Sequence, residues 1–211
     1  MIFSAVGRRS EICDCCPAHP DFRRIQGLDS HMLVTKSAMN SADVINLYTT
    51  LEKLGVEIWI DGGWGVDALL GEQTRPHKDL DIAIEQKDVL MLRQFLQMRG
   101  YRDIKLEDAK SWNFVLGDEN SKEIDVHVIV LDDQGNGLYG PPEKGARYPA
   151  ASLTGTGVIE DRTVRCISPE WMVKFHSGYQ LKEKDFQDVS ALCKKFAIDL
   201  PAAYQQFNKA V

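Results

Sequence analysis

The chain has 211 residues, 44% of them hydrophobic and 27% charged, which is enough for the core of one globular domain with a small appendage. No stretch approaches the roughly 20 apolar residues of a membrane-spanning helix, so we expect no membrane partner. The formal net charge is -6 and the chain has no basic stripe, which argues against duplex nucleic acid as the main partner.

The first 39 residues differ in composition from the rest of the chain. Cys13, Cys15, Cys16 and His19 lie close together there, without any sustained hydrophobic periodicity. Thiolate and imidazole groups are usual zinc ligands, but the Cys-x-Cys-Cys spacing and the lack of a second pair make zinc a minor alternative. We expect residues 1–39 to be a dispensable N-terminal extension, compatible with disorder.

A helix is predicted at residues 41–54, followed by a strand at residues 56–60 that a glycine pair interrupts. A backbone without Cβ atoms at a helix start can approach a phosphate closely and offer it N–H groups. Gly62 and Gly63 are therefore candidate phosphate-binding residues. Asp67, within the short helix that follows, is expected to fix the glycine turn through hydrogen bonds.

Two carboxylates begin the next predicted strand. Side chains alternate along a strand, so Asp79 and Asp81 project from one edge about 7 Å apart. Such a pair repels unless a cation lies between its members, and Mg²⁺ is usually held by one or two carboxylates together with substrate phosphates. Asp79 and Asp81 therefore predict a phosphoryl-transfer site in which both bind metal.

A helix at residues 87–99 precedes two strands, at residues 112–116 and 123–131, joined like a hairpin. In the second strand Asp125 and His127 share one face. A charged residue in so apolar a strand needs a partner or a metal, which makes Asp125 a third carboxylate of the site. Asp125 can complete the metal site or act as general base, and His127 can orient a phosphate or the acceptor.

The C-terminal third combines an irregular segment with strand and helix patterns. Residues 135–156 are rich in Gly, Pro, Ser and Thr, and we expect at most one strand there. Tyr139 in this segment is a candidate to flank the substrate, with filling of the core as the alternative. Strand character returns at residues 158–167, so the domain is expected to cover residues 40–167, followed by a helical C-terminal part at residues 168–211.

The block IDGGWGVDALLGEQTRPHKDLDI at residues 60–82 resembles the lincosamide and aminoglycoside nucleotidyltransferases of the DNA polymerase β superfamily. The resemblance extends roughly over residues 42–192, and the form Gly-Gly-Trp-Gly-Val-Asp is similar to the lincosamide-modifying branch. It implies an α/β (α+β) nucleotidyltransferase fold, with a small mixed sheet flanked by helices. It also implies that Lys184 lies near a triphosphate, whose charge Arg75 can also counter, although Arg75 can equally be a surface charge.

By this resemblance the protein is an Mg²⁺-dependent enzyme that moves a nucleoside monophosphate, AMP from ATP or its equivalent from another nucleoside triphosphate, to a hydroxyl group. The acceptor is expected to be an antibiotic, a lincosamide before an aminoglycoside. Two Mg²⁺ ions would take part. The residues expected to hold the metal ions and the triphosphate are Asp79, Asp81, Asp125, Gly62, Gly63, Arg75 and Lys184.

Other readings of the sequence remain open. An Asp-x-Asp pair also occurs in nucleotide-sugar glycosyltransferases, but those chains are larger and lack the upstream glycine pair. A nucleotidyltransferase that modifies a protein or RNA would keep the same motif, and the acidic charge of the chain makes RNA the poorer choice. A non-catalytic, antitoxin-like binding partner is a further alternative, which the retention of all three carboxylates opposes. The odd number of cysteines, five, predicts reduced thiols and a cytoplasmic protein, and a homodimer is compatible with the sequence.

Overall fold

The structure is a computed structural model that describes residues 38–105, 109–141, 146–177 and 179–210. These residues belong to one compact unit. Most of the expected N-terminal extension, with its zinc alternative, lies outside the described residues. Among the helices that the structure describes, none has both the length and the apolar character needed to cross a membrane.

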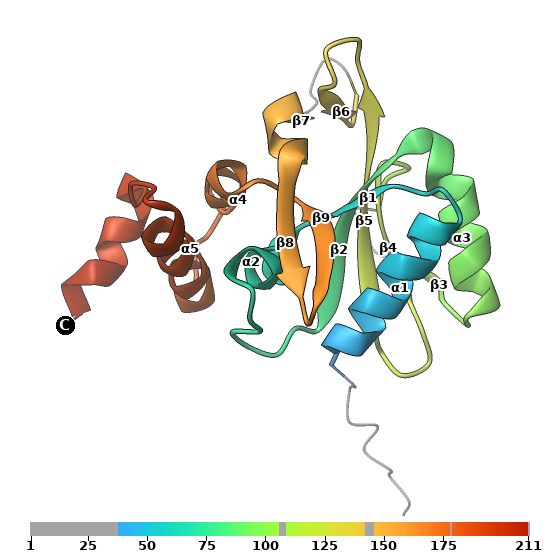
Figure 1. The fold of residues 1–211 in the computed structure, drawn as a ribbon, viewed down its shortest axis with the longest axis horizontal. Helices are drawn as coiled ribbons and strands as arrows, with labels where there is room; N and C mark the ends of the chain where they lie inside the picture. Colours follow the sequence, from blue (N-terminus) through green and yellow to red (C-terminus); the bar gives the residue numbers. More distant parts are fainter. Residues whose placement is uncertain (1–37, 106–108, 142–145, 178, 211) are drawn as a thin grey trace, which may run out of the picture. The chain divides into compact units, whose positions relative to one another are not determined.

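Helices and strands alternate as far as α3, and a run of mainly strands then precedes the C-terminal helices, in an α+β arrangement (Figure 1). The strands are β1 Ile58–Ile60, β2 Asp79–Glu85, β3 Arg102–Ile104, β4 Asn113–Gly117, β5 Glu123–Leu131, β6 Gly137–Tyr139, β7 Ala146–Tyr148, β8 Gly155–Ile159 and β9 Arg162–Cys166. The α-helices are α1 Ser41–Lys53, α2 Gly62–Leu70, α3 Val89–Met98, α4 Pro169–Phe175 and α5 Glu183–Phe196. The 3₁₀ helices are η1 Gln86–Asp88, η2 Ala150–Thr154 and η3 Ala202–Ala210.

The strands form one mixed sheet in the order β3-β4-β5-β2-β1-β9-β8, and β6 and β7 extend from β5. Strands β2 and β5 are parallel, whereas β1 runs antiparallel to β2 and β4 antiparallel to β5. Helix α2 contacts β8, and α4 and α5 pack against α2, while α1 and α3 lie together on the other side of the sheet (Figure 1). The mixed sheet with flanking helices predicted from the sequence is confirmed.

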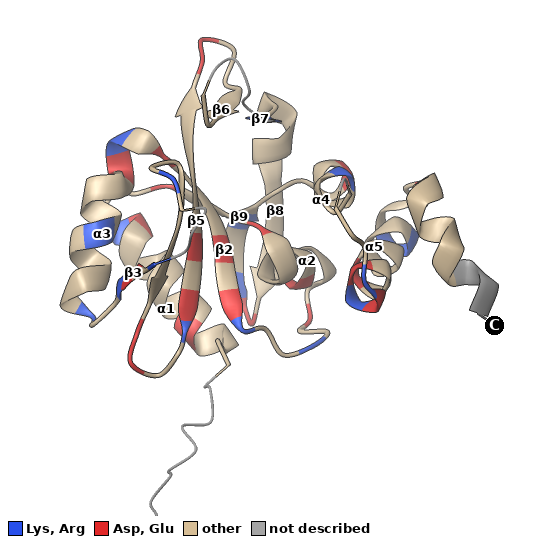
Figure 2. Cartoon of the chain, turned by 180° about the vertical axis from the view of Figure 1, so that it is seen from behind, with Lys and Arg blue, Asp and Glu red and all other residues tan. Residues whose placement is uncertain are grey.

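Alternation along β2 and β5 separates the core from the polar face of the sheet. Every second residue of both strands is buried, as expected for strands with one face in the core. The buried residues of this face are Leu80, Ile82, Ile84, Ile124, Val126 and Val128. Acidic residues on β2 and β5 consequently gather on the opposite face, where the strands lie side by side (Figure 2).

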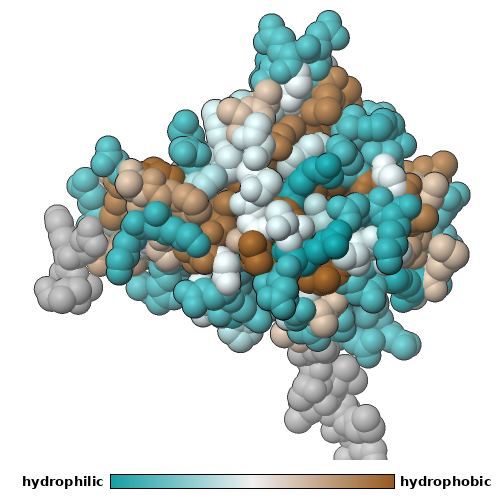
Figure 3. Space-filling view, in the orientation of Figure 1, coloured by the Kyte–Doolittle hydropathy of each residue, from teal (hydrophilic) through white to brown (hydrophobic). Residues whose placement is uncertain are grey.

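The packing of α2 on β8 depends on a glycine. A Cβ atom at Gly157 would lie 2.3 Å from the carbonyl oxygen of Ala68, so only a residue without a side chain lets the two backbones approach this closely. The helix that starts at the glycine pair is thus held directly against the sheet. On the side of the molecule drawn in Figure 1, hydrophobic residues form several separate areas of the surface among hydrophilic ones (Figure 3).

Several elements differ from the sequence prediction. Residues 158–167 are not one strand, because the chain reverses at Glu160, where φ is 52°, and forms the hairpin β8 and β9. The segment predicted to hold at most one strand contains β6, β7 and η2. Within the predicted helical C-terminal part, α4 ends at Phe175 and α5 begins only at Glu183. These differences arise in Gly-rich and short segments, where local periodicity is weak.

Met39 joins the start of the described chain to the core. Its side chain is 2% exposed, and its backbone N–H donates to the carbonyl oxygen of His77 at 3.1 Å. We expect a chain shortened to begin at Met39 to fold cooperatively, because it keeps this contact and the Asn40 cap of α1. A shortened chain that melts without cooperativity would show that residues 1–38 are needed for folding.

In the full-length chain, Met39→Ala should lower the free energy of unfolding by about 2–5 kcal/mol, because it leaves a cavity in the core. The control is Met98→Ala, at a side chain that is 81% exposed, which should change it by less than about 0.5 kcal/mol. Urea denaturation of the two variants measures the difference, and equal values would contradict the placement of Met39 in the core.

Candidate active site

Strands β2 and β5 bring two of the predicted carboxylates together. Their parallel register sets Asp81 opposite Asp125. One ligand atom each from Asp81, Asp125 and His127 lies within 4.8 Å of the other two. The amide of Asn113, on β4, donates to Asp125 Oδ1 at 3.1 Å and so orients this carboxylate. Two adjacent strands thus present an oxygen-rich cluster at the edge of the pocket described below.

Burial and like charges destabilise the ionised forms of these acids. Burial, followed by the charges of Asp79, Asp61 and Asp125, raises the pKa of Asp81 well above its ordinary value. Burial also raises the pKa of Asp125, while His127 and the Asn113 hydrogen bond act in the opposite direction. Four carboxylates that repel one another in this way form a favourable place for a cation.

Asp79 stands at the exposed start of β2, outside the three-residue cluster. Its charge nevertheless raises the pKa of both Asp81 and Asp125, so it lies near them. Carboxylate oxygens are the donors that Mg²⁺ prefers, whereas imidazole suits transition metals better. The residues therefore fit Mg²⁺ through Asp81 and Asp125, and metal binding by Asp79 stays a prediction.

The glycine pair is required by close contacts. Gly62 has φ +54°, and a Cβ atom there would lie 2.0 Å from Asp81 Oδ2. A Cβ atom at Gly63 would lie 2.4 Å from His77 Nδ1 and 2.9 Å from Arg75 Nη2. The start of α2 can therefore lie against the Asp81 carboxylate because Gly62 lacks a side chain, and Gly63 leaves room for the side chains of His77 and Arg75. Phosphate binding by Gly62 and Gly63 stays a prediction.

Asp61 lines the same pocket, although the residue pattern around it did not predict a place there. It is the N-cap of α2, where its Oδ1 accepts from the Gly62 N–H at 2.8 Å, and its backbone N–H donates to the carbonyl oxygen of Asp81 at 2.9 Å. Its Oδ2 accepts from the Tyr148 hydroxyl at 3.1 Å. The signal in the sequence was an aspartate directly before a helix, which is a preferred N-cap residue.

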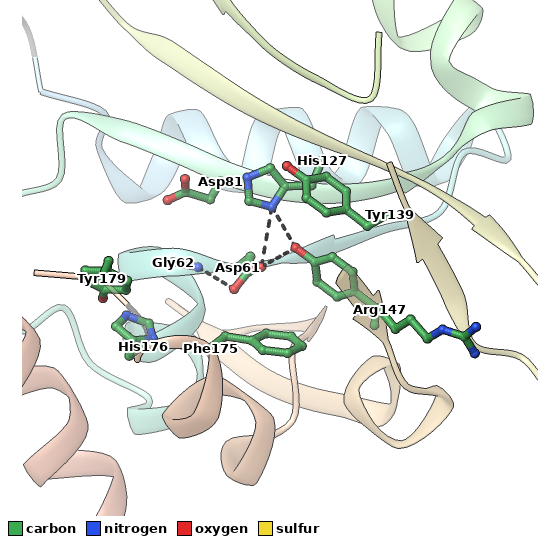
Figure 4. A pocket seen from close by; sticks show the side chains of 10 residues that line it. Asp61, Gly62, Asp81, His127, Tyr139, Arg147, Phe175, His176 and Tyr179 are labelled. Atoms are coloured by element: carbon green, nitrogen blue, oxygen red, sulfur yellow. Dashed lines mark hydrogen bonds and ion pairs between the residues drawn. The ribbon is translucent and has the colours of Figure 1, made fainter. Parts of the chain in front are cut away.

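A pocket of about 300 Å³ opens beside the cluster (Figure 4). Burial raises the pKa of Tyr139 to about 12, so its hydroxyl is protonated at neutral pH. Tyr139 lies on the wall of the pocket, and its contact with a substrate stays a prediction. The residues that line the pocket are Asp61, Gly62, Asp81, His127, Tyr139, Arg147, Tyr148, Phe175, His176 and Tyr179.

Arg75 is paired within the protein. Its Nη2 donates to Asp188 Oδ2, on α5, at 2.7 Å, and its Nη1 lies 3.1 Å from His77 Nδ1. The Nε2 of His77 contacts Asp67, which also accepts from the Thr74 backbone and hydroxyl at 3.1 and 2.7 Å. Asp67 therefore fixes the loop after α2 rather than the glycine turn itself.

Lys184 lies in the first turn of α5 and is exposed. Its charge acts on the carboxylate of Asp81, where it opposes the rise in pKa caused by burial and by the neighbouring acids. Helix α5 thus brings one cation toward the carboxylate cluster and is itself bound to the Arg75 loop through Asp188. Contacts of Lys184 and Arg75 with a triphosphate stay predictions.

Loss of the Arg75 partner should destabilise the fold. We expect Asp188→Asn to lower the free energy of unfolding by about 3 kcal/mol, because Asp188 is 4% exposed and the guanidinium would lose its counter-charge. Asp103→Asn, which removes an exposed partner of Arg93, should cost less than about 1 kcal/mol. Urea denaturation compares them, and similar losses would mean that the Arg75 pair contributes little.

Comparison with known proteins places the chain among antibiotic-modifying enzymes. The profile of the aminoglycoside-2''-adenylyltransferase family matches residues 43–192. The chain is 36% identical over 141 residues to a lincosamide resistance protein of Staphylococcus haemolyticus, covering 67% of this chain and 86% of the relative. It is 30% identical over 124 residues to a 2''-aminoglycoside nucleotidyltransferase of Klebsiella pneumoniae, covering 58% of this chain and 64% of that relative.

A solved structure supports the same assignment. The crystal structure of a lincosamide antibiotic adenylyltransferase, LnuA, with lincomycin bound, superposes with a TM-score of 0.66 at 30% identity, covering 77% of this chain and all (100%) of that one. The resemblance seen in the sequence is therefore confirmed. The chain belongs to the aminoglycoside-2''-adenylyltransferase family and is a nucleotidyltransferase.

Proposed function

We propose that this enzyme transfers AMP from ATP, with Mg²⁺, to a hydroxyl group of a lincosamide antibiotic and so confers resistance. The observation that carries the proposal is the pairing of Asp81 with Asp125 beside a pocket of about 300 Å³. The similarity to a lincosamide resistance protein and to a lincomycin-bound adenylyltransferase supports the choice of acceptor. We place the reaction in the cytoplasm, in accord with the free, buried thiols of Cys166 and Cys193.

Asp81 would hold the metal, with Asp79 beside it and with Asp125 as a further ligand in one of its two alternative roles, and we propose two ions in the complete site. Bound Mg²⁺ would neutralise charge on the triphosphate and lower the pKa of the acceptor hydroxyl. Lys184 is better placed than Arg75 to counter the remaining phosphate charge, because the Arg75 guanidinium already pairs with Asp188. Gly62 and Gly63 leave room for a phosphate to approach the start of α2.

In the transfer, the acceptor oxygen forms a bond to the α-phosphorus of ATP while the bond to pyrophosphate breaks. The hydroxyl proton needs an acceptor. Asp125 is suited to this role because burial raises its pKa and makes its carboxylate a stronger base than an exposed aspartate. Asn113 holds the carboxylate in place. Metal binding by Asp125 is the alternative role, and both place it beside the reacting oxygen.

The chemistry of the pocket favours a lincosamide over an aminoglycoside. Tyr139, Tyr148 and Phe175 contribute aromatic rings to its wall. An aminoglycoside carries several ammonium groups, which require carboxylates that are not already engaged. The acids that line the pocket are Asp61, whose oxygens bond to Gly62 and Tyr148, and Asp81, which belongs to the metal cluster. We propose that Tyr139 and His127 flank the bound lincosamide.

Mass spectrometry of reaction mixtures tests the acceptor and the nucleotide together. Lincomycin, clindamycin and several aminoglycosides are each incubated with the protein, Mg²⁺ and one of the four nucleoside triphosphates. We expect an AMP adduct of the lincosamides, at a kcat/KM at least about tenfold above that for any aminoglycoside. An adduct confined to aminoglycosides would contradict the acceptor assignment, and no adduct on any of the antibiotics would favour a protein or RNA acceptor.

The metal cluster has its own test. Asp81→Asn should lower kcat/KM by about 1,000-fold, since several kcal/mol of charge stabilisation would be lost. Asp103→Asn, an exposed acid on β3, should leave the rate within about twofold and serves as the matched control. Chelation of Mg²⁺ should abolish turnover, and added Mg²⁺ should restore it. Turnover by Asp81→Asn at the wild-type rate would exclude this cluster as the site.

A further inference from the structure

Tyr148 connects three separate parts of the site. It lies on β7, within the segment predicted to be irregular, and its ring packs against Phe175 and Tyr139 with centroid distances of 5.1 and 5.9 Å. Its hydroxyl lies between Asp61 Oδ2, at 3.1 Å, and His127 Nδ1, at 2.7 Å. One buried hydroxyl thus links the wall of the pocket to the start of α2 and to β5.

The direction of these two hydrogen bonds follows from counting protons. Asp61 is 6% exposed, and its other oxygen already accepts from the Gly62 N–H. A buried carboxylate needs donors, so the single hydroxyl proton of Tyr148 goes to Asp61 Oδ2. The hydroxyl oxygen can then only accept at 2.7 Å from His127, and the imidazole must donate from Nδ1.

With Nδ1 donating, the other ring nitrogen faces the reaction centre. His127 Nε2 lies 3.7 Å from Asp125 Oδ1, and the ring also packs against Tyr139 with a centroid distance of 5.4 Å. In the neutral ring Nε2 then has a free lone pair. That lone pair is available to accept a hydrogen bond from a group that binds between His127 and Asp125.

We propose that Tyr148 is a positioning residue for the nucleotidyl transfer proposed above, on which this inference rests. Its hydroxyl, anchored by Asp61, holds the imidazole of His127 in the form protonated at Nδ1 and directs Nε2 toward Asp125. An imidazole whose Nδ1–H donates to a fixed hydroxyl keeps both its ring orientation and the lone pair on Nε2. Because Tyr148 also forms part of the pocket wall, it joins the acceptor site to the catalytic strand.

Nitrogen NMR of the full-length protein tests the arrangement without turnover. With ¹⁵N-labelled histidine, the neutral ring of His127 should carry its proton on Nδ1, and the signals are assigned from their loss in His127→Gln. In Tyr148→Phe the proton should move to Nε2, the form that free imidazole side chains favour in water. Protonation of Nε2 in the wild type, or no change in Tyr148→Phe, would overturn the proposal.

Kinetics supply the second measurement. Tyr148→Phe should lower kcat by about 10- to 100-fold, with the KM for ATP within about twofold, because only the support of His127 is lost. In a His127→Ala background the same change should alter kcat by less than about twofold. If the fold-loss in kcat of the double variant equals the product of the two single losses, Tyr148 does not act through His127, which would overturn the proposal.

Tyr48→Phe is the matched control, because the Tyr48 hydroxyl is buried away from the site and accepts from the Arg165 N–H at 3.0 Å. It should reproduce any general loss of stability without changing the His127 signals or kcat. The same change in the His127 nitrogen signals in Tyr48→Phe would mean that any buried tyrosine substitution affects His127, which would overturn the proposal. If none of the antibiotics is modified, the proposed acceptor fails, while the NMR result still decides the role of Tyr148.

Discussion

The parallel pairing of β2 with β5 is the contact on which the site depends. It sets Asp81 opposite Asp125, and burial of the alternate residues fixes the register, since a shift by one residue would turn the core side chains toward solvent. Burial of the two carboxyl groups themselves raises the pKa of both acids. Hydrophobic packing on one face of the sheet thus provides the free energy that holds repelling carboxylates together on the other.

A second set of interactions holds α2, the helix that begins at the glycine pair, in place. Gly63 leaves space for His77 and Arg75, and these side chains connect the loop after α2 to Asp67 and Asp188. Because Asp188 lies on α5, one ion pair ties the C-terminal helix to the loop that precedes β2. The first turn of the same helix carries Lys184 near the carboxylate cluster. The C-terminal part therefore contributes to the site as well as to the packing of the domain.

The wall of the pocket is built from residues that lie far from the motif in the sequence. The Tyr148 hydroxyl is hydrogen-bonded to Asp61, which lies 87 positions earlier in the sequence, and to His127, which lies 21 positions earlier. Aromatic rings on this wall suit an acceptor with apolar groups, while the neighbouring carboxylates suit a metal ion that would in turn bind the triphosphate. The pocket thus combines the two chemical surfaces that transfer of a nucleoside monophosphate to a small antibiotic requires.

The sequence by itself determined the local elements and the motif. Alternation put Asp79 and Asp81 on one face of a strand, the glycine pair marked the start of α2, and the motif identified the family, because these signals depend on neighbouring residues. Only the tertiary structure showed that Asp81, Asp125 and His127 lie within 4.8 Å of one another, and that Asp61 lies beside them in the pocket. It also decided that Arg75 pairs with a residue 113 positions away. Hydrogen bonds over such separations depend on how strands and helices pack, and no periodicity along the chain records that packing.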